Sequence, residues 1–452
     1  MAGKPRKLIL RSAPSSSGWM VGRWAVRLDQ LITGDRLRVY PVLLIVAGGL
    51  GLVAGSIVRV LDPAIQGAFL PDYLAHWTGG RLLLDNPEHL YDPETQNRVQ
   101  GEALGATPHL AWFVSPPIVA ALYAPLAFIP YNLSGIVWLA TNTAVLIFCI
   151  LSLSTLAPNL MRHRRKLVFL AVLAAPPTFE LMGSGQDSAF VLLLWLVGIH
   201  LFRAGYPGWA GAILGLGFAK PQLVLVVPLV LLAMRSYKAL AAFVAVVGAI
   251  SGVSFALVGL EGIGQWTSAL SSPLYMEEVQ QGQAWKMVGI PSLIQALVPP
   301  EWGTGIAPLL TTASLPLGAV LLLAALLRLK KAALDPQAVW IATLATTLTF
   351  SPHLATYDAV LFVPVVIFLL ERRSTLALRT ATVSAFLLMW MVAPLHLAAL
   401  TLPWPLSALD APWAALPLAV IWLQSLRALR ALRPENHEEM RQAPGRPGEQ
   451  GA

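Results

Sequence analysis

Long apolar stretches, separated by short polar or basic segments, run through most of this 452-residue chain. The hydrocarbon core of a bilayer is about 30 Å thick, so a crossing helix needs about 20 residues, or fewer where it is tilted or paired. On that rule the sequence predicts an all-α polytopic membrane protein with a bundle of about twelve transmembrane helices. The expected spans lie at about 40–61, 133–157, 166–182, 188–203, 208–234 (two short helices) and 238–260, with five more between 304 and 433.

One apolar stretch, from Ser115-Pro116-Pro117 to Pro130, is expected to lie along the membrane surface rather than to cross it. Counting it as a span would reverse every later helix and carry the basic cluster 162–166 to the outer side. Lys and Arg are enriched in the cytoplasmic loops of membrane proteins, which argues against that reversal. We therefore predict that the first outer loop is large and bears interfacial helices.

Charge sets the predicted orientation and the division of the chain. Residues 1–39 are basic and lack the apolar core of a cleavable signal peptide, so they are expected to be a cytoplasmic N-terminal segment. The transmembrane domain then covers 40–433 and contains two acidic outer loops, at 61–132 and 261–304. Residues 434–452, rich in Pro, Gly, Glu and Arg, are expected to form a disordered cytoplasmic tail.

Composition argues against a soluble protein and against nucleic-acid binding. Hydrophobic residues make up 56% of the chain and charged residues 12%, whereas soluble domains carry about 25% charged residues. The formal charge of +8 does not indicate nucleic-acid binding, because the bases fall in short clusters at span ends. The single cysteine, Cys149, lies in an apolar span. Without a Cys/His cluster, an HExxH or DxD motif, or a Gly-Lys-Ser/Thr loop, we expect neither a metal nor a cofactor.

Asp72 is the first candidate for chemistry. It follows the first span closely, so it should lie at the bilayer surface, where a carboxylate is a functional hypothesis by default. The alternative is structural, because an Asp directly before the apolar run that begins at Tyr73 can cap a helix.

Lys220 is the second candidate, because an ammonium group in an apolar stretch costs about 2.5–3.5 kcal/mol to insert and needs a partner or a wet cavity. Pro221 lacks an N–H and breaks the helix beside it. A lysine at such a break can receive a lipid phosphate as a point charge. The alternative is an intramembrane ion pair with an aspartate such as Asp187.

His353 follows Ser351-Pro352, with Tyr357 and Asp358 about one turn beyond. A histidine can donate to a phosphate or to a sugar hydroxyl, or it can be a structural residue at a broken helix end. Under the predicted topology the polar residues that interrupt apolar surroundings all fall on the outer side, where we therefore expect any reaction. They are Asp72, Arg81, Gln186, Asp187, Lys220, Lys286, His353 and Asp358.

Short motifs occur over roughly 60–370 in an order typical of one family. They are Asp72-Tyr73, Gly79-Gly80-Arg81, Tyr91-Asp92, Ser115-Pro116-Pro117, Ala124-Pro125-Leu126, Gly185-Gln186-Asp187, Ala219-Lys220-Pro221-Gln222, Trp285-Lys286-Met287, Ser351-Pro352-His353 and Asp358-Ala359-Val360. In these motifs the chain resembles glycosyltransferase family 87, the polyprenol-phosphate-mannose-dependent mannosyltransferases. That family often carries Trp and His after its Ser-Pro, whereas here the run is His-Leu-Ala-Thr-Tyr-Asp.

The resemblance implies a GT-C type fold whose first outer loop supplies a catalytic aspartate, and an inverting transfer without metal. By position Asp72 matches that aspartate, and Lys220 matches the lysine that faces the donor phosphate. The remaining outer residues complete the predicted site. Lys286 and His353 are expected to bind the donor phosphate, and the sugar or acceptor is expected to meet Arg81, Gln186, Asp187, Tyr357 and Asp358.

The predicted function is transfer of a hexose, mannose by the resemblance, from a polyprenyl-phosphate donor to a lipid-linked or glycan acceptor at the periplasmic face of a bacterial inner membrane. A carboxylate that takes the acceptor proton and cations that stabilise the departing phosphate suit this displacement. The expected partners are donor, acceptor and membrane lipids, without nucleic acid or an obligate protein. A transporter or flippase of lipid-linked sugars is the alternative, although such proteins tend to show internal repeats and midplane sites. A non-catalytic scaffold would not explain Asp72 with Lys220.

Overall fold

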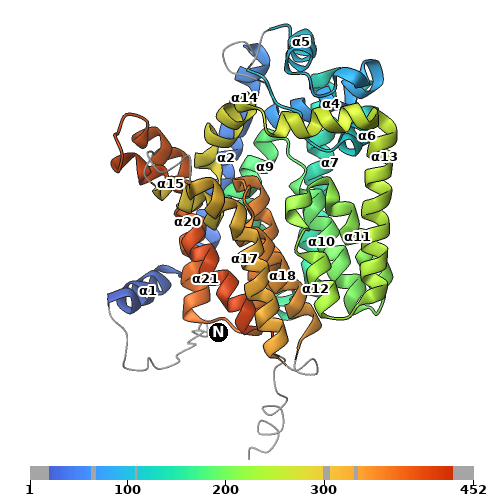
Figure 1. Ribbon diagram of the computed structural model, residues 1–452. Helices are drawn as coiled ribbons and strands as arrows, with labels where there is room; N and C mark the ends of the chain where they lie inside the picture. The colour runs from blue at the N-terminus through green and yellow to red at the C-terminus, as the bar shows by residue number, and fades with distance from the viewer. Residues whose placement is uncertain (1–19, 63–67, 107–108, 299–305, 330–333, 431–452) are drawn as a thin grey trace, which may run out of the picture.

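The computed structural model describes residues 20–62, 68–106, 109–298, 306–329 and 334–430. Within these ranges the regular elements are helices, most of which run side by side along one axis of the molecule (Figure 1). The first 19 residues and the predicted disordered tail at 434–452 lie outside the described residues. The rest of the predicted N-terminal segment contains a helix, α1 (Met20–Leu31), that the sequence reading did not anticipate.

The helices follow the predicted spans closely. α2 (Arg36–Leu61) leads to three helices of the first outer loop, which are α4 (Pro71–Asp85), α5 (Pro93–Leu104) and α6 (Pro117–Ala127), with η1 (Pro87–His89) between the first two. The bundle continues through α7 (Tyr131–Ser152), η2 (Leu153–Thr155), α8 (Pro158–Leu173), α9 (Pro176–Ser184), α10 (Ser188–Arg203), α11 (Pro207–Leu216), η3 (Gly217–Ala219), η4 (Pro221–Leu223), α12 (Val227–Ala233) and α13 (Tyr237–Leu270).

The second outer loop is built from short elements, and five helices complete the bundle. The loop contains α14 (Pro273–Tyr275), η5 (Met276–Gln281), η6 (Ala284–Lys286) and α15 (Ile290–Leu297). The helices that follow are α17 (Ile306–Arg328), α18 (Pro336–Phe350), α19 (Phe362–Arg372), α20 (Leu376–Ala399) and α21 (Ala415–Arg427), with η8 (Thr356–Leu361) before α19 and η9 (Leu406–Asp410) before α21.

Among the described residues, five helices are long and apolar enough to cross a membrane, or six if the bent pair α8 and α9 is one span. The five are α2, α7 with η2, α13, α17 from Leu309, and α20. Several predicted spans correspond to helices of 7 to 16 residues, among them α10, α11, α12 and α21. The chain is therefore an integral membrane protein, and the predicted total of about twelve crossings stays a prediction.

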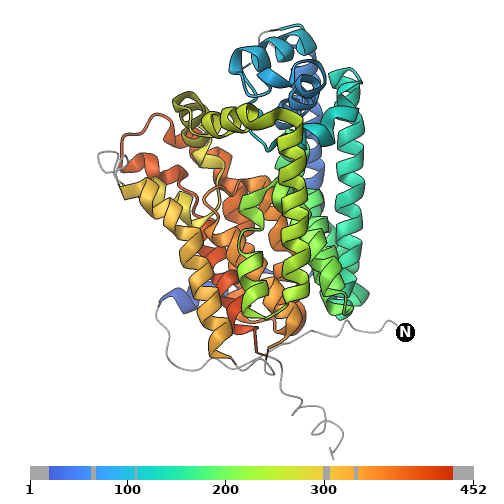
Figure 2. The same cartoon turned by 45° about the vertical axis from the view of Figure 1, so that its right-hand side comes forward.

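α13 changes direction at Gly259, where φ is 68°, a value that L side chains rarely adopt. Residues beyond this break form an outer arm, 260–270, that crosses the top of the molecule in both views (Figures 1 and 2). The arm is held by Trp266, whose indole N–H donates to the Val114 carbonyl oxygen at 2.9 Å. The predicted second outer loop therefore begins as helix rather than as irregular chain.

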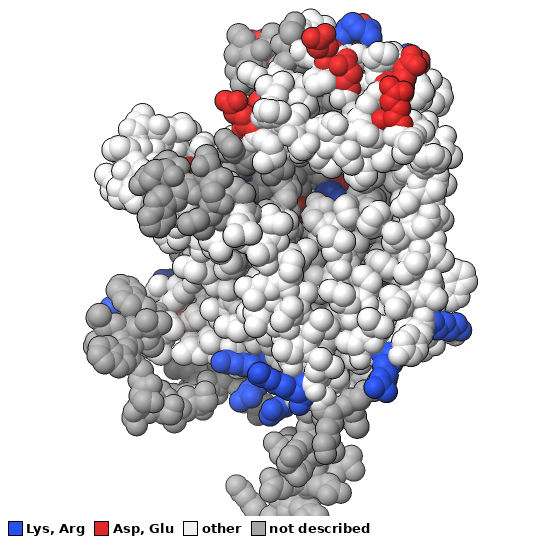
Figure 3. Space-filling model, viewed as in Figure 1, with Lys and Arg blue, Asp and Glu red and all other residues white. Residues whose placement is uncertain are grey.

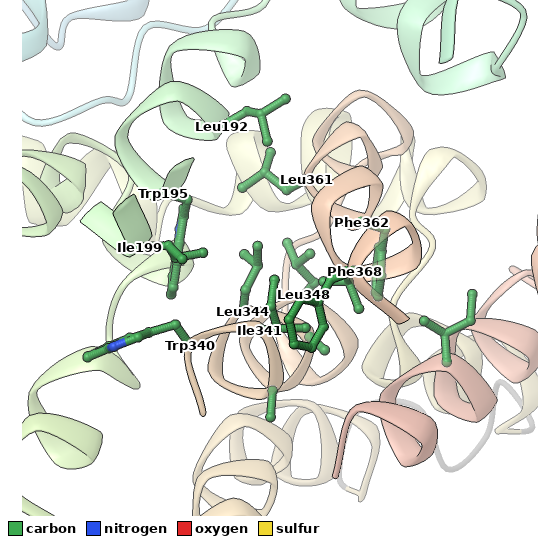
Figure 4. Close-up of a cluster of buried hydrophobic side chains, with 14 of the residues drawn as sticks. Leu192, Trp195, Ile199, Trp340, Ile341, Leu344, Leu348, Leu361, Phe362 and Phe368 are labelled. Carbon is green, nitrogen blue, oxygen red and sulfur yellow. The ribbon is translucent and has the colours of Figure 1, made fainter. Parts of the chain in front are cut away.

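The largest apolar core lies inside the bundle. Figure 4 shows Leu192, Trp195 and Ile199 of α10 facing Trp340, Ile341, Leu344 and Leu348 of α18, with Leu361 of η8 and Phe362 and Phe368 of α19 beside them. Lipid tails are as apolar as these side chains, so inside a bilayer the contacts stabilise the fold through close packing rather than through removal from water. This core holds η8 and the start of α10 in place; η8 carries the predicted site residues Tyr357 and Asp358, and Gln186 and Asp187 directly precede α10.

α2 stands at the edge of the bundle, and glycines allow it to pack closely against α9. A Cβ added at Gly48 would lie 2.5 Å from the Phe179 ring, and one at Gly183 would lie 2.8 Å from Leu52. Small residues let membrane helices approach in this way. The rest of α2 is largely exposed on the protein surface, as expected of a helix surrounded by lipid.

Charged side chains separate along the long axis (Figure 3). Asp and Glu gather at the end formed by the first outer loop and the outer arm of α13, which we call the acidic end. Lys and Arg gather at the opposite end, the basic end, where α10, α17, α19 and α21 finish at Arg203, Arg328, Arg372 and Arg427. This separation follows the charge pattern that predicted the topology.

Candidate active site

Asp72 lies in the first turn of α4, close to the acidic end. Pro71 opens the helix, as proline prefers to do, and Leu70 occupies the cap position, so Asp72 is not the helix cap. The carboxylate is half-buried and has no hydrogen bond or ion pair with the described residues. The helix N-terminus favours its negative charge.

Lys220 lies at the break between α11 and α12, where the chain forms the single turns η3 and η4 on either side of it. Its ammonium group is 2.6 Å from Asp187 Oδ1 and 3.4 Å from Asp358 Oδ1. Only 15%, 17% and 2% of the three side chains, in the order Lys220, Asp187 and Asp358, is exposed, so this is a buried ion-pair group. The intramembrane pair that the sequence left open as an alternative is therefore present.

Neighbouring polar groups fix this cluster. Lys220 Nζ also donates to Gln186 Oε1 at 3.1 Å, and the Ser188 hydroxyl donates to Asp358 Oδ1 at 2.5 Å. The Gln186 carbonyl oxygen accepts from the Asn142 side chain on α7. Elements from three parts of the sequence thus meet at one point: the turn between α9 and α10, the break at Lys220, and η8.

His353 and Tyr357 are affected by the charges of both Asp72 and this cluster. Burial lowers the pKa of His353, while the charges of Asp358 and Asp72 act in the opposite direction. Burial also raises the pKa of Tyr357 well above 10, and Asp72 is the largest of the charges that add to this shift. Lys220 Nζ is 5.3 Å from the Tyr357 ring centroid. Asp72 and Lys220 therefore act electrostatically on the same two side chains.

Lys286 reaches the site from the second outer loop. Its ammonium group is 3.6 Å from Glu180 Oε1 on α9, and both side chains are about one-third exposed, at 33% and 35%. The loop is fastened to the segment that carries His353, because Thr356 Oγ1 donates to the Lys286 carbonyl oxygen at 2.7 Å and Val288 N donates to the Leu354 carbonyl oxygen at 2.8 Å. Lys286 is therefore the more accessible of the two predicted lysines.

His76, which the sequence reading did not single out, lies one turn after Asp72 on α4. Its Nδ1 is 3.0 Å from the Asp72 carbonyl oxygen, and its ring stacks on Tyr123 with centroids 4.7 Å apart. Burial lowers the pKa of His76, and the charge of Asp187 opposes this shift. The Tyr123 hydroxyl is buried and has no hydrogen-bond partner among the described residues. These two side chains form a wall between α4 and α6 beside the Lys220 cluster.

Arg81 does not join the other predicted residues. It lies nine positions along α4 from Asp72, roughly 13 Å away along the helix axis. Its guanidinium pairs with Asp85 at 2.7 Å on the helix surface. In the part of the chain that the structure describes, no three His, Cys, Asp or Glu side chains are grouped as a metal ion would require.

The residues brought together form two parts with different chemistry. Asp72 is a carboxylate without a partner among the described residues, and its charge acts on His353 and Tyr357. These two side chains and Lys286 are able to donate to an anion or to a hydroxyl. Figure 3 shows a hollow below the acidic end with charged side chains of both signs at its bottom. Such an arrangement suits a polar substrate that needs one proton removed and one negative charge stabilised.

Comparison with known proteins agrees with the motifs. The family described as Glycosyltransferase family 87 matches residues 113–352, which is more than half of the chain. No curated protein and no solved structure matches. The matched range includes Asp187, Lys220 and Lys286, whereas Asp72 precedes it and His353 directly follows it.

Proposed function

The chain belongs to glycosyltransferase family 87 and is a membrane glycosyltransferase, and from that premise we propose which reaction it performs. It transfers a hexose, mannose in our proposal, from a polyprenyl-phosphate donor to a lipid-linked or glycan acceptor, with inversion. The acidic end faces the outside of a bacterial inner membrane, in keeping with the Lys and Arg gathered at the other end.

The observation that carries this proposal is the carboxylate of Asp72, which has no partner among the described residues and whose charge acts on His353 and Tyr357. Inverting transfer needs a base that removes the acceptor hydroxyl proton while the acceptor oxygen attacks the anomeric carbon. Asp72 has no partner among the described residues that would occupy its lone pairs. Of the three carboxylates of the site it is the one best suited to that role, because Asp187 and Asp358 both pair with Lys220.

The bond from the anomeric carbon to the phosphate oxygen breaks as the new glycosidic bond forms, and the polyprenyl phosphate leaves with the electron pair. Lys286 and His353 stabilise the developing phosphate charge. Lys220 lies farther inside, where its ammonium group is already paired with the carboxylates of Asp187 and Asp358. We propose that Lys220 faces the donor phosphate only through this cluster, while Gln186, Asp187, Tyr357 and Asp358 contact the sugar.

The experiment is reconstitution of the purified chain in liposomes with a panel of polyprenyl-phosphate hexoses and a labelled acceptor extract. We expect a glycosylated product from one donor, and release of polyprenyl phosphate in equal amount. The anomeric configuration of the product, read by NMR, is expected to be opposite to that of the donor. Movement of an intact donor between leaflets without any product would overturn the proposal and favour a flippase.

A further inference from the structure

A second cavity lies at the basic end, far from the candidate active site. It measures about 290 Å³ and is formed where α19 ends, α20 begins and α21 ends. This volume is at the lower limit for small-molecule pockets, so the cavity suits a head group rather than a nucleotide. Its polar lining is basic, and includes Arg372, Arg373, Arg427 and Arg430.

The arginines of this cavity differ in how they are paired. Arg372 Nη1 is 2.6 Å from Asp335 Oδ2, which leaves this side chain only 13% exposed. Arg373, Arg427 and Arg430 are exposed and form no ion pair with any carboxylate of the described residues. Three guanidinium groups with unused donors therefore converge on one hollow.

The start of α20 adds backbone donors to the same hollow. The first turn of a helix leaves N–H groups without intrahelical partners and favours a negative charge. Thr375 caps only one of them, accepting from Leu378 N at 3.1 Å, and Thr375 itself lines the cavity. Arg379 on the next turn of α20 is held by Asp29 of α1 through two bonds of 2.7 and 2.8 Å, which fixes this wall.

An apolar strip leads from the cavity into the membrane region. On α21 the side chains of Leu416 and Leu423 are 51% and 44% exposed, and Leu423 lies one turn before Arg427 on the same face. An exposed leucine strip that ends at a basic hollow offers acyl chains a surface that continues from the phosphate toward the middle of the membrane. Basic hollows between helices on the cytoplasmic side bind anionic lipid head groups in this manner.

We propose that this cavity binds the phosphate of an anionic membrane lipid. The phosphate oxygens accept from Arg373, Arg427 and Arg430 and from the first N–H groups of α20, while the acyl chains lie along Leu416 and Leu423. The site is independent of the proposed transfer reaction, because it lies at the opposite end of the molecule.

The test is native mass spectrometry of the full chain titrated with phosphatidylglycerol and, separately, with phosphatidylcholine. Replacing Arg373, Arg427 and Arg430 by Gln is expected to weaken phosphatidylglycerol binding at least about tenfold, since each basic residue near an anionic lipid contributes measurably. The matched control replaces Arg162, Arg164 and Arg165 on α8, which removes the same charge from cytoplasmic arginines outside the cavity. That control is expected to change binding less than about twofold.

Equal loss in both triple variants would overturn the site, because it would reflect net charge alone. Sodium phosphate and glycerophosphate separate the two sources of the anion. If they bind as tightly as phosphatidylglycerol and with the same sensitivity, the ligand is a soluble phosphate and the lipid assignment fails. Arg427→Gln alone, at an exposed side chain, is expected to show part of the same loss even if the triple variant does not fold.

Discussion

The candidate site contains one carboxylate without a partner among the described residues and two that share a counterion, and the difference lies in what surrounds them. Asp72 on α4 has no partner among the described residues and is partly open. Asp187 and Asp358 are each within 3.4 Å of the Lys220 ammonium group and are mostly buried. The first carboxylate is free to take up a proton, while the other two are committed to a counterion.

This difference indicates which part of the site takes part in the reaction and which part stabilises the fold. Separating a buried ion pair is costly, because the charge that remains has neither water nor a partner. Removing a partly open carboxylate without a partner leaves nothing unsatisfied. Substitutions at Lys220 and at Asp72 should therefore affect different properties of the protein.

The largest expected effect is on the rate at Asp72. Asp72→Asn preserves size but cannot accept the acceptor proton, so we expect turnover to fall by about 10² to 10⁴. The thermal midpoint should change little, because the favourable interaction with the helix N-terminus is worth only about 0.3–1 kcal/mol. Transfer assays and thermal unfolding of the same preparations measure both.

Asp85→Asn is the control, because Asp85 ends the same helix and pairs with Arg81 on the surface. It should keep full activity. An active Asp72→Asn enzyme would remove Asp72 from the chemistry, and Asp187 or Asp358 would become the candidate base.

The second effect is on stability at Lys220. Lys220→Met leaves Asp187 and Asp358 buried without a counterion, so we expect a loss of about 3–5 kcal/mol in the free energy of unfolding. Lys286→Met removes a pair with Glu180 that is about one-third exposed, for which about 1 kcal/mol or less is expected. Unfolding in detergent, followed by tryptophan fluorescence, compares the two variants.

A folded Lys220→Met protein that no longer binds donor would contradict this division and give Lys220 a direct contact with the phosphate. Lys220→Arg keeps the charge and should retain part of the stability. Combining Lys220→Met with Asp358→Asn should recover some of the loss, because one unpaired charge is removed.

The third effect is on donor binding at Lys286. Lys286→Gln should raise the donor KM about tenfold, as expected for one charged hydrogen bond to a phosphate, while the thermal midpoint stays near its original value. Initial rates at varied donor concentration measure it. An unchanged KM with a lowered midpoint would assign Lys286 to holding Glu180 instead.

The smallest effect concerns pH and His76. Burial lowers the pKa of His76, so the folded protein favours the neutral ring. The stability that depends on this is present above the pKa of an unfolded histidine, about 6.5, and is lost as pH falls below it. The thermal midpoint should fall between pH 7.5 and 5.5, and His76→Gln should reduce this fall, whereas His89→Gln at an exposed position should not.

The positions of the helices could be predicted from sequence because they depend on local patterns. Most expected spans have a helix within a few residues, whereas the span expected at about 166–182 is the bent pair α8 and α9, which begins at Pro158. The break at Lys220-Pro221 follows from the missing proline N–H. α1 was not predicted, because the first 39 residues were interpreted only for their charge and for the absence of a signal peptide. The arm of α13 was not predicted, because the span was expected to end at about residue 260. The chain turns at Gly259 but continues as a helix to Leu270.

The residues of the site were harder to find, because their meaning lies in contacts between distant parts of the chain. Glu180 falls inside a stretch assigned to a span, and only the fold places it beside Lys286, more than 100 residues later. His76 follows Asp72 by one helical turn, a spacing that could have drawn attention to it. Nothing in the sequence indicated that Tyr123 would stack on its ring.

The contact of Gly48 with Phe179 constrains the order in which the protein is made. Phe179 follows Gly48 by 131 positions, and at about 5–20 residues per second this stretch takes roughly 7 to 26 s to be synthesised. During that interval α2 is complete while α9, which carries Phe179, is not yet translated. Its own hydropathy must hold α2 in the bilayer, which accounts for the complete absence of charged residues between Arg38 and Arg59.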